Sequence, residues 1–216
     1  MKNLEKLKYH QDHIEETNWP EDVHSDEIIQ VRHFLDIIEK IDTKIPTMIE
    51  LGHSNRSPYS KTFNDIFDRE CVNICTDILE TNMIQAEKEW KENNWNGFFY
   101  HGYSGIPILK HEPMSYLDNH GGQLRIKDLM LKHSINILDI LHMDIQGSEV
   151  FVLSELEEDN FFNNIRYGII SIHDTYDQCM SIINENVKDV VYLFKHPTQG
   201  GYGDGCIVYF NPNTRA

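Results

Sequence analysis

Acidic and histidine side chains follow apolar segments of this chain at positions where they could act together. Asp144 follows the segment 135–143, and His173 and Asp174 follow the segment 167–172. Carboxylate and imidazole groups can remove a proton from a substrate, and they can hold Mg²⁺, or Mn²⁺ where an imidazole ligates. We therefore predict Asp144 and His173 as catalytic residues, and Asp144, His173 and Asp174 as metal ligands. The alternative for Asp144 is that it caps the next helix. The alternative for His173 is that it is a buried histidine with a structural role only.

A turn that could contact a ligand lies in the sequence IELGHSNRSPYS, residues 49–60. Glu50 stands at the end of an apolar segment, and Gly52 lets the backbone bend tightly beside a ligand. We predict that Glu50, Gly52, His53 and Ser54 bind a cofactor. A structural turn into a helix explains the glycine equally well.

Two further segments end in residues that suit a bound nucleoside. Asp77 ends the sequence CVNICTD, where a carboxylate can accept hydrogen bonds from both hydroxyls of a ribose. Its alternative role is to cap the following helix. His101 and Tyr103 end the segment 97–103, and we predict them beside the base of the same nucleoside.

The elements that position these residues alternate between strand and helix patterns. Short apolar segments predict seven strands, at 47–51, 71–76, 97–103, 135–143, 167–172, 190–194 and 206–210. Amphipathic segments predict helices between them, at 59–69, 82–92, 125–133, 148–156 and 176–184. This order indicates an α/β fold with a mostly parallel sheet. The loop 196–205 is too short for a crossover helix, so the last strand should be antiparallel.

In an open parallel sheet, ligands bind beyond the carboxyl ends of the strands. All the candidate residues lie at such ends, so one edge of the sheet should carry the site. Residues 1–45 are predicted as an N-terminal helical extension of a catalytic domain at 46–216. An apolar helical stripe between Ile28 and Ile41 could serve a contact within the chain or a dimer contact.

The composition narrows the classes of partner. The chain has 35 Asp and Glu residues but only 19 Lys and Arg residues. Because the resulting net charge of −16 would repel a phosphate backbone, we expect no nucleic acid partner. The apolar segments are too short to span a membrane, and the charged N-terminus does not resemble a signal peptide. We expect a cytoplasmic protein with no membrane partner. Its four cysteines form no CxxC pair and are expected to be reduced and buried.

The segment LHMDIQGSEV, residues 141–150, resembles the FkbM family of methyltransferases. Leu141, Asp144, Gly147 and Glu149 match the family pattern, whereas histidine 142 and glutamine 146 replace its lysine and second acid. The resemblance extends over about residues 46–175. The first turn departs from the usual methyltransferase form, since Ser54 and an arginine stand where further glycines are common.

The resemblance implies a Rossmann-like methyltransferase fold, S-adenosylmethionine as cofactor, and O-methylation of a sugar or other small hydroxylated molecule. A hydroxyl is a poor acid, so the transfer needs a base, a metal ion or both. Glu149 is expected to support the substrate side or the start of a helix. A nicotinamide-dependent oxidoreductase lacks its GxGxxG spacing here, and a non-catalytic module with a decayed cofactor turn is the other alternative.

Overall fold

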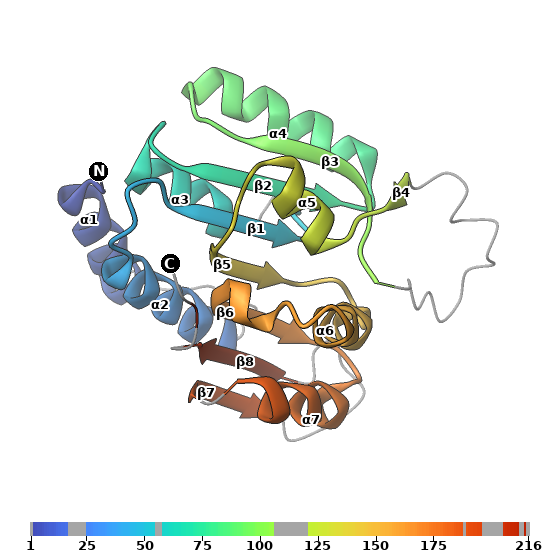
Figure 1. Cartoon of the computed structure of the whole chain (residues 1–216). Coiled ribbons are helices and arrows are strands. Elements are labelled where there is room, and N and C mark those ends of the chain that lie inside the picture. The colour runs from blue at the N-terminus through green and yellow to red at the C-terminus, as the bar shows by residue number, and fades with distance from the viewer. Residues whose placement is uncertain are drawn as a thin grey trace.

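The computed structural model of the chain describes residues 2–16, 25–54, 58–105, 121–187, 189–195, 205–211 and 214. They form one mixed sheet with helices on both faces (Figure 1). The strands are β1 (Thr47–Leu51), β2 (Val72–Asp77), β3 (Phe98–Tyr103), β4 (Gly122–Gln123), β5 (Leu138–Met143), β6 (Ile165–Ile172), β7 (Asp189–Lys195) and β8 (Gly205–Phe210). The helices are α1 (Leu4–Glu16), α2 (Ser25–Lys40), α3 (Tyr59–Phe67), α4 (Glu80–Asn93), α5 (Ile126–Lys132), α6 (Glu149–Glu158) and α7 (Tyr176–Asn186), with a short 3₁₀ turn at Phe162–Asn164.

The strand order is β4-β3-β2-β1-β5-β6-β8-β7. The central strands run parallel, whereas β8 lies antiparallel to both of its neighbours, β6 and β7. This arrangement confirms the predicted mostly parallel α/β sheet with an antiparallel last strand. All seven predicted strands form. The two-residue strand β4 was not predicted because two residues carry no periodicity. The predicted glycine-rich loop 196–205 lies outside the described residues, except for Gly205, which is the first residue of β8.

The order of the strands reverses beside β1. The chain passes from β1 to β2 and β3 on one side and later returns to place β5 on the other side of β1. Such a switch point leaves a crevice beyond the carboxyl ends of the two central strands, where open α/β sheets bind ligands. The candidate residues at the ends of β1 and β5 therefore lie at the position that the topology favours.

Each face of the sheet carries its own apolar layer. Helices α5, α6 and α7 lie in front of the sheet in Figure 1 and pack on Ile49, Leu51 and their neighbours. On the opposite face, Phe34, Leu35 and Ile38 of α2 are buried against a second layer that includes the strand residues Met48, Ile140 and Ile169.

The predicted stripe of α2 thus serves a contact within the chain. Phe34, Leu35, Ile37 and Ile38 of α2 belong to the core on this face of the sheet, while the predicted domain boundary at residue 45 stays a prediction. None of the four cysteines forms a disulfide bond, and all four are buried, as expected. Among the described helices, none combines the length and the apolar character that crossing a membrane requires.

Candidate functional site

Backbone hydrogen bonds hold the carboxyl ends of the three central strands together. The amides of Gly52 and His53 donate to the carbonyl oxygen of Thr76 at 3.0 and 2.8 Å, which ties the turn after β1 to β2. The amide of Asp144 donates to the carbonyl oxygen of Leu51 at 3.0 Å, which ties the end of β5 to β1. The first turn and the DIQGSE segment therefore lie side by side at one edge of the sheet.

Asp144 and His173 meet at this edge, because β5 and β6 are parallel neighbours. His173 Nε2 lies 3.6 Å from Asp144 Oδ1 and 3.2 Å from the side-chain amide nitrogen of Gln146. The imidazole keeps 14% of its surface exposed and the Asp144 carboxylate keeps 44%. Both predicted catalytic groups can therefore reach a substrate in solvent.

Glu149 has a larger part in this site than the sequence indicated. Its fully buried carboxylate accepts hydrogen bonds from the amides of Ile145 and Gly147, at 3.1 and 2.9 Å, and lies 2.9 Å from His173 Nδ1. A carboxylate can only accept, so Nδ1 carries the hydrogen and donates it to Glu149. His173 Nε2 is then the basic nitrogen, and the Gln146 amide donates to it. Glu149 thus orients the imidazole and fixes its tautomer.

The turn that carries Glu149 has an unusual backbone. Gln146 and Gly147 follow one another with φ values of 55° and 98°, and Asp174, on the neighbouring strand end, has a φ of 59°. Residues other than glycine rarely have a positive φ, and those that do tend to lie at functional sites. The only sequence signal for this turn is the pair of polar residue and glycine in DIQGSE.

The three predicted metal ligands do not converge. In the part of the chain that the structure describes, one group of three residues brings its ligand atoms within 4.8 Å of one another, and it consists of Glu50, His53 and Cys75. Asp174 is exposed and does not join Asp144 and His173 in such a group. His173 and Asp174 both follow the end of β6 at Ile172, and Asp174 has a left-handed backbone with a φ of 59°.

Two side chains of the turn after β1 are buried, although they were predicted to contact a cofactor. Gly52 has a φ of 84°, and a Cβ atom there would lie 1.9 Å from the Asp144 carbonyl oxygen, so only glycine fits. Ser54 is exposed, but the side chains of Glu50 and His53 are fully buried. A direct cofactor contact through Glu50 or His53 would require this turn to rearrange.

Glu50 and His53 form a buried ion pair in which Glu50 Oε2 lies 2.5 Å from His53 Nδ1. Burial alone would raise the pKa of Glu50, but His53 and His142 hold it well below the usual value. Burial alone would lower the pKa of His53, but Glu50 and Cys75 raise it to about 11. In the absence of any bound ion, the pair is therefore a carboxylate and an imidazolium.

Asp77 and His101 are register partners at the ends of β2 and β3. The Asp77 carboxylate accepts a 2.6 Å hydrogen bond from the amide of Leu79, the N-cap residue of α4, so it fixes the turn before the helix and does not itself cap the helix. Burial raises the pKa of Asp77. His101 Nε2 lies 3.1 Å from the carbonyl oxygen of Ile78, and Tyr103 is half-buried at the end of β3.

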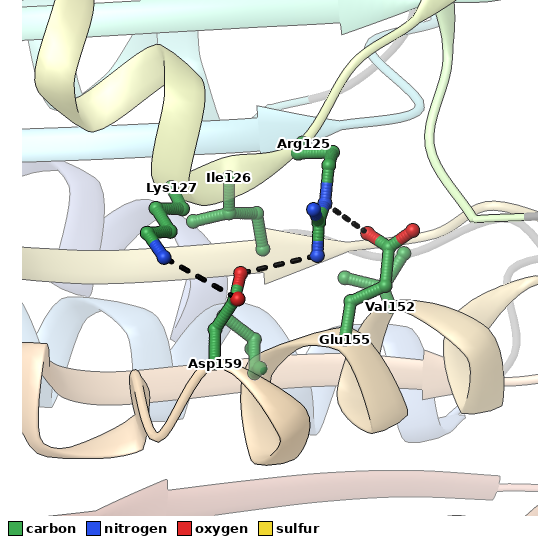
Figure 2. Close-up of a pocket in the computed structure, with 7 residues that line it drawn as sticks. Arg125, Ile126, Lys127, Val152, Glu155 and Asp159 are labelled. Atoms are coloured by element: carbon green, nitrogen blue, oxygen red, sulfur yellow. Dashed lines mark hydrogen bonds and ion pairs between the residues drawn. The ribbon is translucent and has the colours of Figure 1, made fainter.

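A separate small cleft lies between α5 and α6 (Figure 2). There, Asp159 accepts from Arg125 at 3.1 Å and from Lys127 at 3.3 Å, and Glu155 lies 3.6 Å from Arg125. Such exposed pairs contribute roughly 0.2–1 kcal/mol each. Because each of these charges faces an opposite charge within the cleft, the ion pairs join the start of α5 to α6.

Neither a family model nor a curated protein sequence matches the chain. Solved structures do. The METTL16 MTase domain aligns with a TM-score of 0.54 and 14% identity over 86% of this chain and 67% of that one. A second crystal form aligns with a TM-score of 0.52 and 12% identity, over 95% and 79% of the two chains. Fibrillarin from Aeropyrum pernix, solved with natively bound S-adenosyl-L-methionine, aligns with a TM-score of 0.51 and 11% identity, over 77% of this chain and 67% of that one. The strand order and these alignments together show that the chain has the Rossmann-like fold of the methyltransferases.

Proposed function

We propose that the protein is an S-adenosylmethionine-dependent methyltransferase that acts on a hydroxyl group of a sugar or another small molecule. The observation that carries this proposal is the pair of Glu149 and His173, with 2.9 Å between Oε1 and Nδ1, at the switch point of the sheet. A partly exposed imidazole held by a buried carboxylate is suited to remove the proton of a hydroxyl. The fold supports the cofactor, because fibrillarin binds S-adenosyl-L-methionine with the same fold.

The residues at the strand ends fit this cofactor. The Asp77 carboxylate stands at the end of β2, where an acid can accept from ribose hydroxyls. Ser54 is exposed in the turn after β1 and can contact the amino acid part, while Gly52 shapes that turn. His101 and Tyr103, at the end of β3, would lie beside the adenine. Glu50 and His53 would support the turn from below.

His173 and its neighbours would carry out the chemistry in three steps. The exposed Asp144 carboxylate accepts a hydrogen bond from the acceptor hydroxyl and orients it. Once the substrate hydroxyl replaces the Gln146 amide at His173 Nε2, this nitrogen takes the hydroxyl proton as the oxygen attacks, and Glu149 stabilises the resulting imidazolium. The bound cofactor supplies an electrophilic methyl carbon. Afterwards the proton leaves His173 to solvent.

Metal assistance is the second way to acidify a hydroxyl. Asp144 and His173 are close enough to share an ion such as Mg²⁺ or Mn²⁺, and Asp174 would have to turn toward them to complete the predicted set. We favour the base because His173 has a carboxylate that orients it, whereas the third ligand is not in place. Turnover that depends on added Mg²⁺ or Mn²⁺ would reverse this preference.

Calorimetric titration of the full chain with S-adenosylmethionine should show binding of about one molecule per chain. Transfer of a labelled methyl group to a panel of sugars and small phenolics should then identify the acceptor. The net charge of −16 opposes binding of a polyanion, so we expect an RNA arm of the panel to remain unlabelled. Absence of binding would overturn the proposal and favour a non-catalytic module, and binding of a nicotinamide dinucleotide in its place would favour an oxidoreductase.

The variant Glu149→Gln is expected to lower kcat by about 10–100-fold, the usual cost of losing an outer partner that orients a functional histidine. A glutamine amide can present a hydrogen to Nδ1 and so favour the wrong tautomer. The KM for S-adenosylmethionine should stay within about twofold, since no part of this pair contacts the cofactor in the proposed arrangement. Steady-state kinetics measures both constants.

The matched control is Glu158→Gln, which removes an exposed carboxylate from the same helix. It should leave kcat and KM unchanged. A Glu149→Gln protein that folds, binds the cofactor and turns over at the rate of the unmodified chain would show that Glu149 only shapes the turn.

A further inference from the structure

Four side chains that can ligate a metal gather beneath the first turn, on the face of the sheet covered by α3 and α4. Cys75, Glu50 and His142 are register partners on β2, β1 and β5. Partner residues on neighbouring parallel strands point to the same face, so these three side chains form a row across the sheet. His53 follows Glu50 by three residues and joins the row from the turn. All four side chains are buried.

Short distances connect the members of this cluster. The Glu50 carboxylate contacts both imidazoles, with 2.5 Å from Oε2 to His53 Nδ1 and 3.2 Å from Oε1 to His142 Nδ1. The ligand atoms of Glu50, His53 and Cys75 all lie within 4.8 Å of one another. One ion of the size of Zn²⁺, with ligands at about 2.0–2.3 Å, can contact atoms that are spaced in this way after small side-chain movements.

The cluster also holds polar atoms that lack partners. His53 Nε2 and both ring nitrogens of His142 are buried without a hydrogen-bond partner among the described residues, and His142 Nδ1 is the nitrogen of that ring that faces Glu50. A buried polar group left unsatisfied typically costs about 1–3 kcal/mol. A second observation, independent of the distances, therefore points to a group that would engage these imidazoles.

We propose that Glu50, His53, Cys75 and His142 form a structural Zn²⁺ site. Imidazole and thiolate ligands favour Zn²⁺ over Mg²⁺ or Ca²⁺, which prefer oxygen. The Cys75 thiolate and the Glu50 carboxylate together cancel the charge of the ion, so the filled site is neutral inside the core. In the filled site Cys75 would ligate as a thiolate and His53 as a neutral imidazole, and the protons that binding displaces from the ligands would leave to solvent.

The surroundings indicate a closed structural site rather than a catalytic one. Tyr59 of α3 stacks on His142 with 3.9 Å between ring centroids, and Trp90 of α4 meets His53 edge-on at 5.5 Å. These rings cover the cluster, and its four side chains are buried, whereas a catalytic zinc site keeps one position open to the substrate. The ion would enter as the chain folds and would join β2, β1 and β5 beneath the first turn.

The test uses the full chain, purified without chelator, and elemental analysis is expected to find about one zinc per chain. Replacement of zinc by Co²⁺ should produce a thiolate-to-cobalt charge-transfer band and the intense visible bands of tetrahedral cobalt. Cys75→Ser should abolish the charge-transfer band. It should also weaken metal affinity by more than about 100-fold, because about 100-fold is the largest usual loss for a residue that only hydrogen-bonds to a metal ligand. Cys71→Ser is the matched control, because Cys71 is a buried thiol that contacts Asn64 and Asp68 outside the cluster.

Two results would overturn this proposal. One is an unmodified chain that folds without zinc and shows no cobalt bands, and the other is a charge-transfer band that survives Cys75→Ser. If Cys75→Ser fails to fold, the unmodified chain still decides, because removal of its metal should lower Tm and added Zn²⁺ should restore it. Metal content does not depend on the proposed methyl transfer, so calorimetry with S-adenosylmethionine on the same samples reports separately on that function.

Discussion

Replacement of His173 by alanine is expected to lower kcat for methyl transfer by about 10²–10⁴-fold, the usual contribution of a positioned general base. The imidazole is the group that Glu149 orients and that lies between Asp144 and Gln146, and alanine leaves nothing to take the hydroxyl proton. Affinity for S-adenosylmethionine should change by less than about threefold. Single-turnover assays with a labelled methyl group measure the rate, and calorimetry measures the affinity.

The matched control for this prediction is His10→Ala. His10 also pairs with a carboxylate, since its Nε2 lies 3.0 Å from Asp65 Oδ2, but it belongs to α1 and lies away from the strand ends. Its loss should leave kcat unchanged. If His173→Ala turned over at a rate near that of the unmodified chain, Asp144 or water would be the proton acceptor and the proposed base would be wrong.

Replacement of Gly52 by alanine is expected to remove a large part of the free energy of unfolding. An added Cβ would lie 1.9 Å from the Asp144 carbonyl oxygen, and the φ of 84° is unfavourable for a residue with a side chain. Overpacking costs about 1–3 kcal/mol, and backbone strain adds about 1–3 kcal/mol. Since domains are stable by only about 5–15 kcal/mol, urea denaturation should show a greatly lowered midpoint or no folded baseline.

Gly122→Ala provides the control, because a Cβ atom at Gly122 meets nothing within 4 Å. Its free energy of unfolding should stay within about 0.5 kcal/mol of that of the unmodified chain. A Gly52→Ala protein with an unchanged urea midpoint would mean that the turn after β1 can move away from Asp144, and that the packing between the two strand ends is not tight in solution.

Periodicity and residue type were sufficient to predict the elements of the fold. All seven predicted strands form, and each predicted helix between them begins and ends within a few residues of the observed one, because each has an apolar pattern that matches its own period. The short loop before the last strand was sufficient to predict its antiparallel direction. The rule that ligands bind at strand ends also brought Asp144 and His173 together correctly, since it depends only on chain direction and on neighbouring strands.

The tertiary structure decided which side each candidate faces and what each one contacts. Glu149 was expected at a helix start, and only the close approach of β6 made it the partner of His173. Glu50 and His53 were expected at a cofactor, yet both are buried beneath the turn. In the row of Cys75, Glu50 and His142, Glu50 is paired with residues 25 and 92 positions away in the sequence by the register of three strands. A sequence pattern fixes the period and the direction of each element, whereas contacts between distant elements depend on the register and packing that form when the sheet assembles.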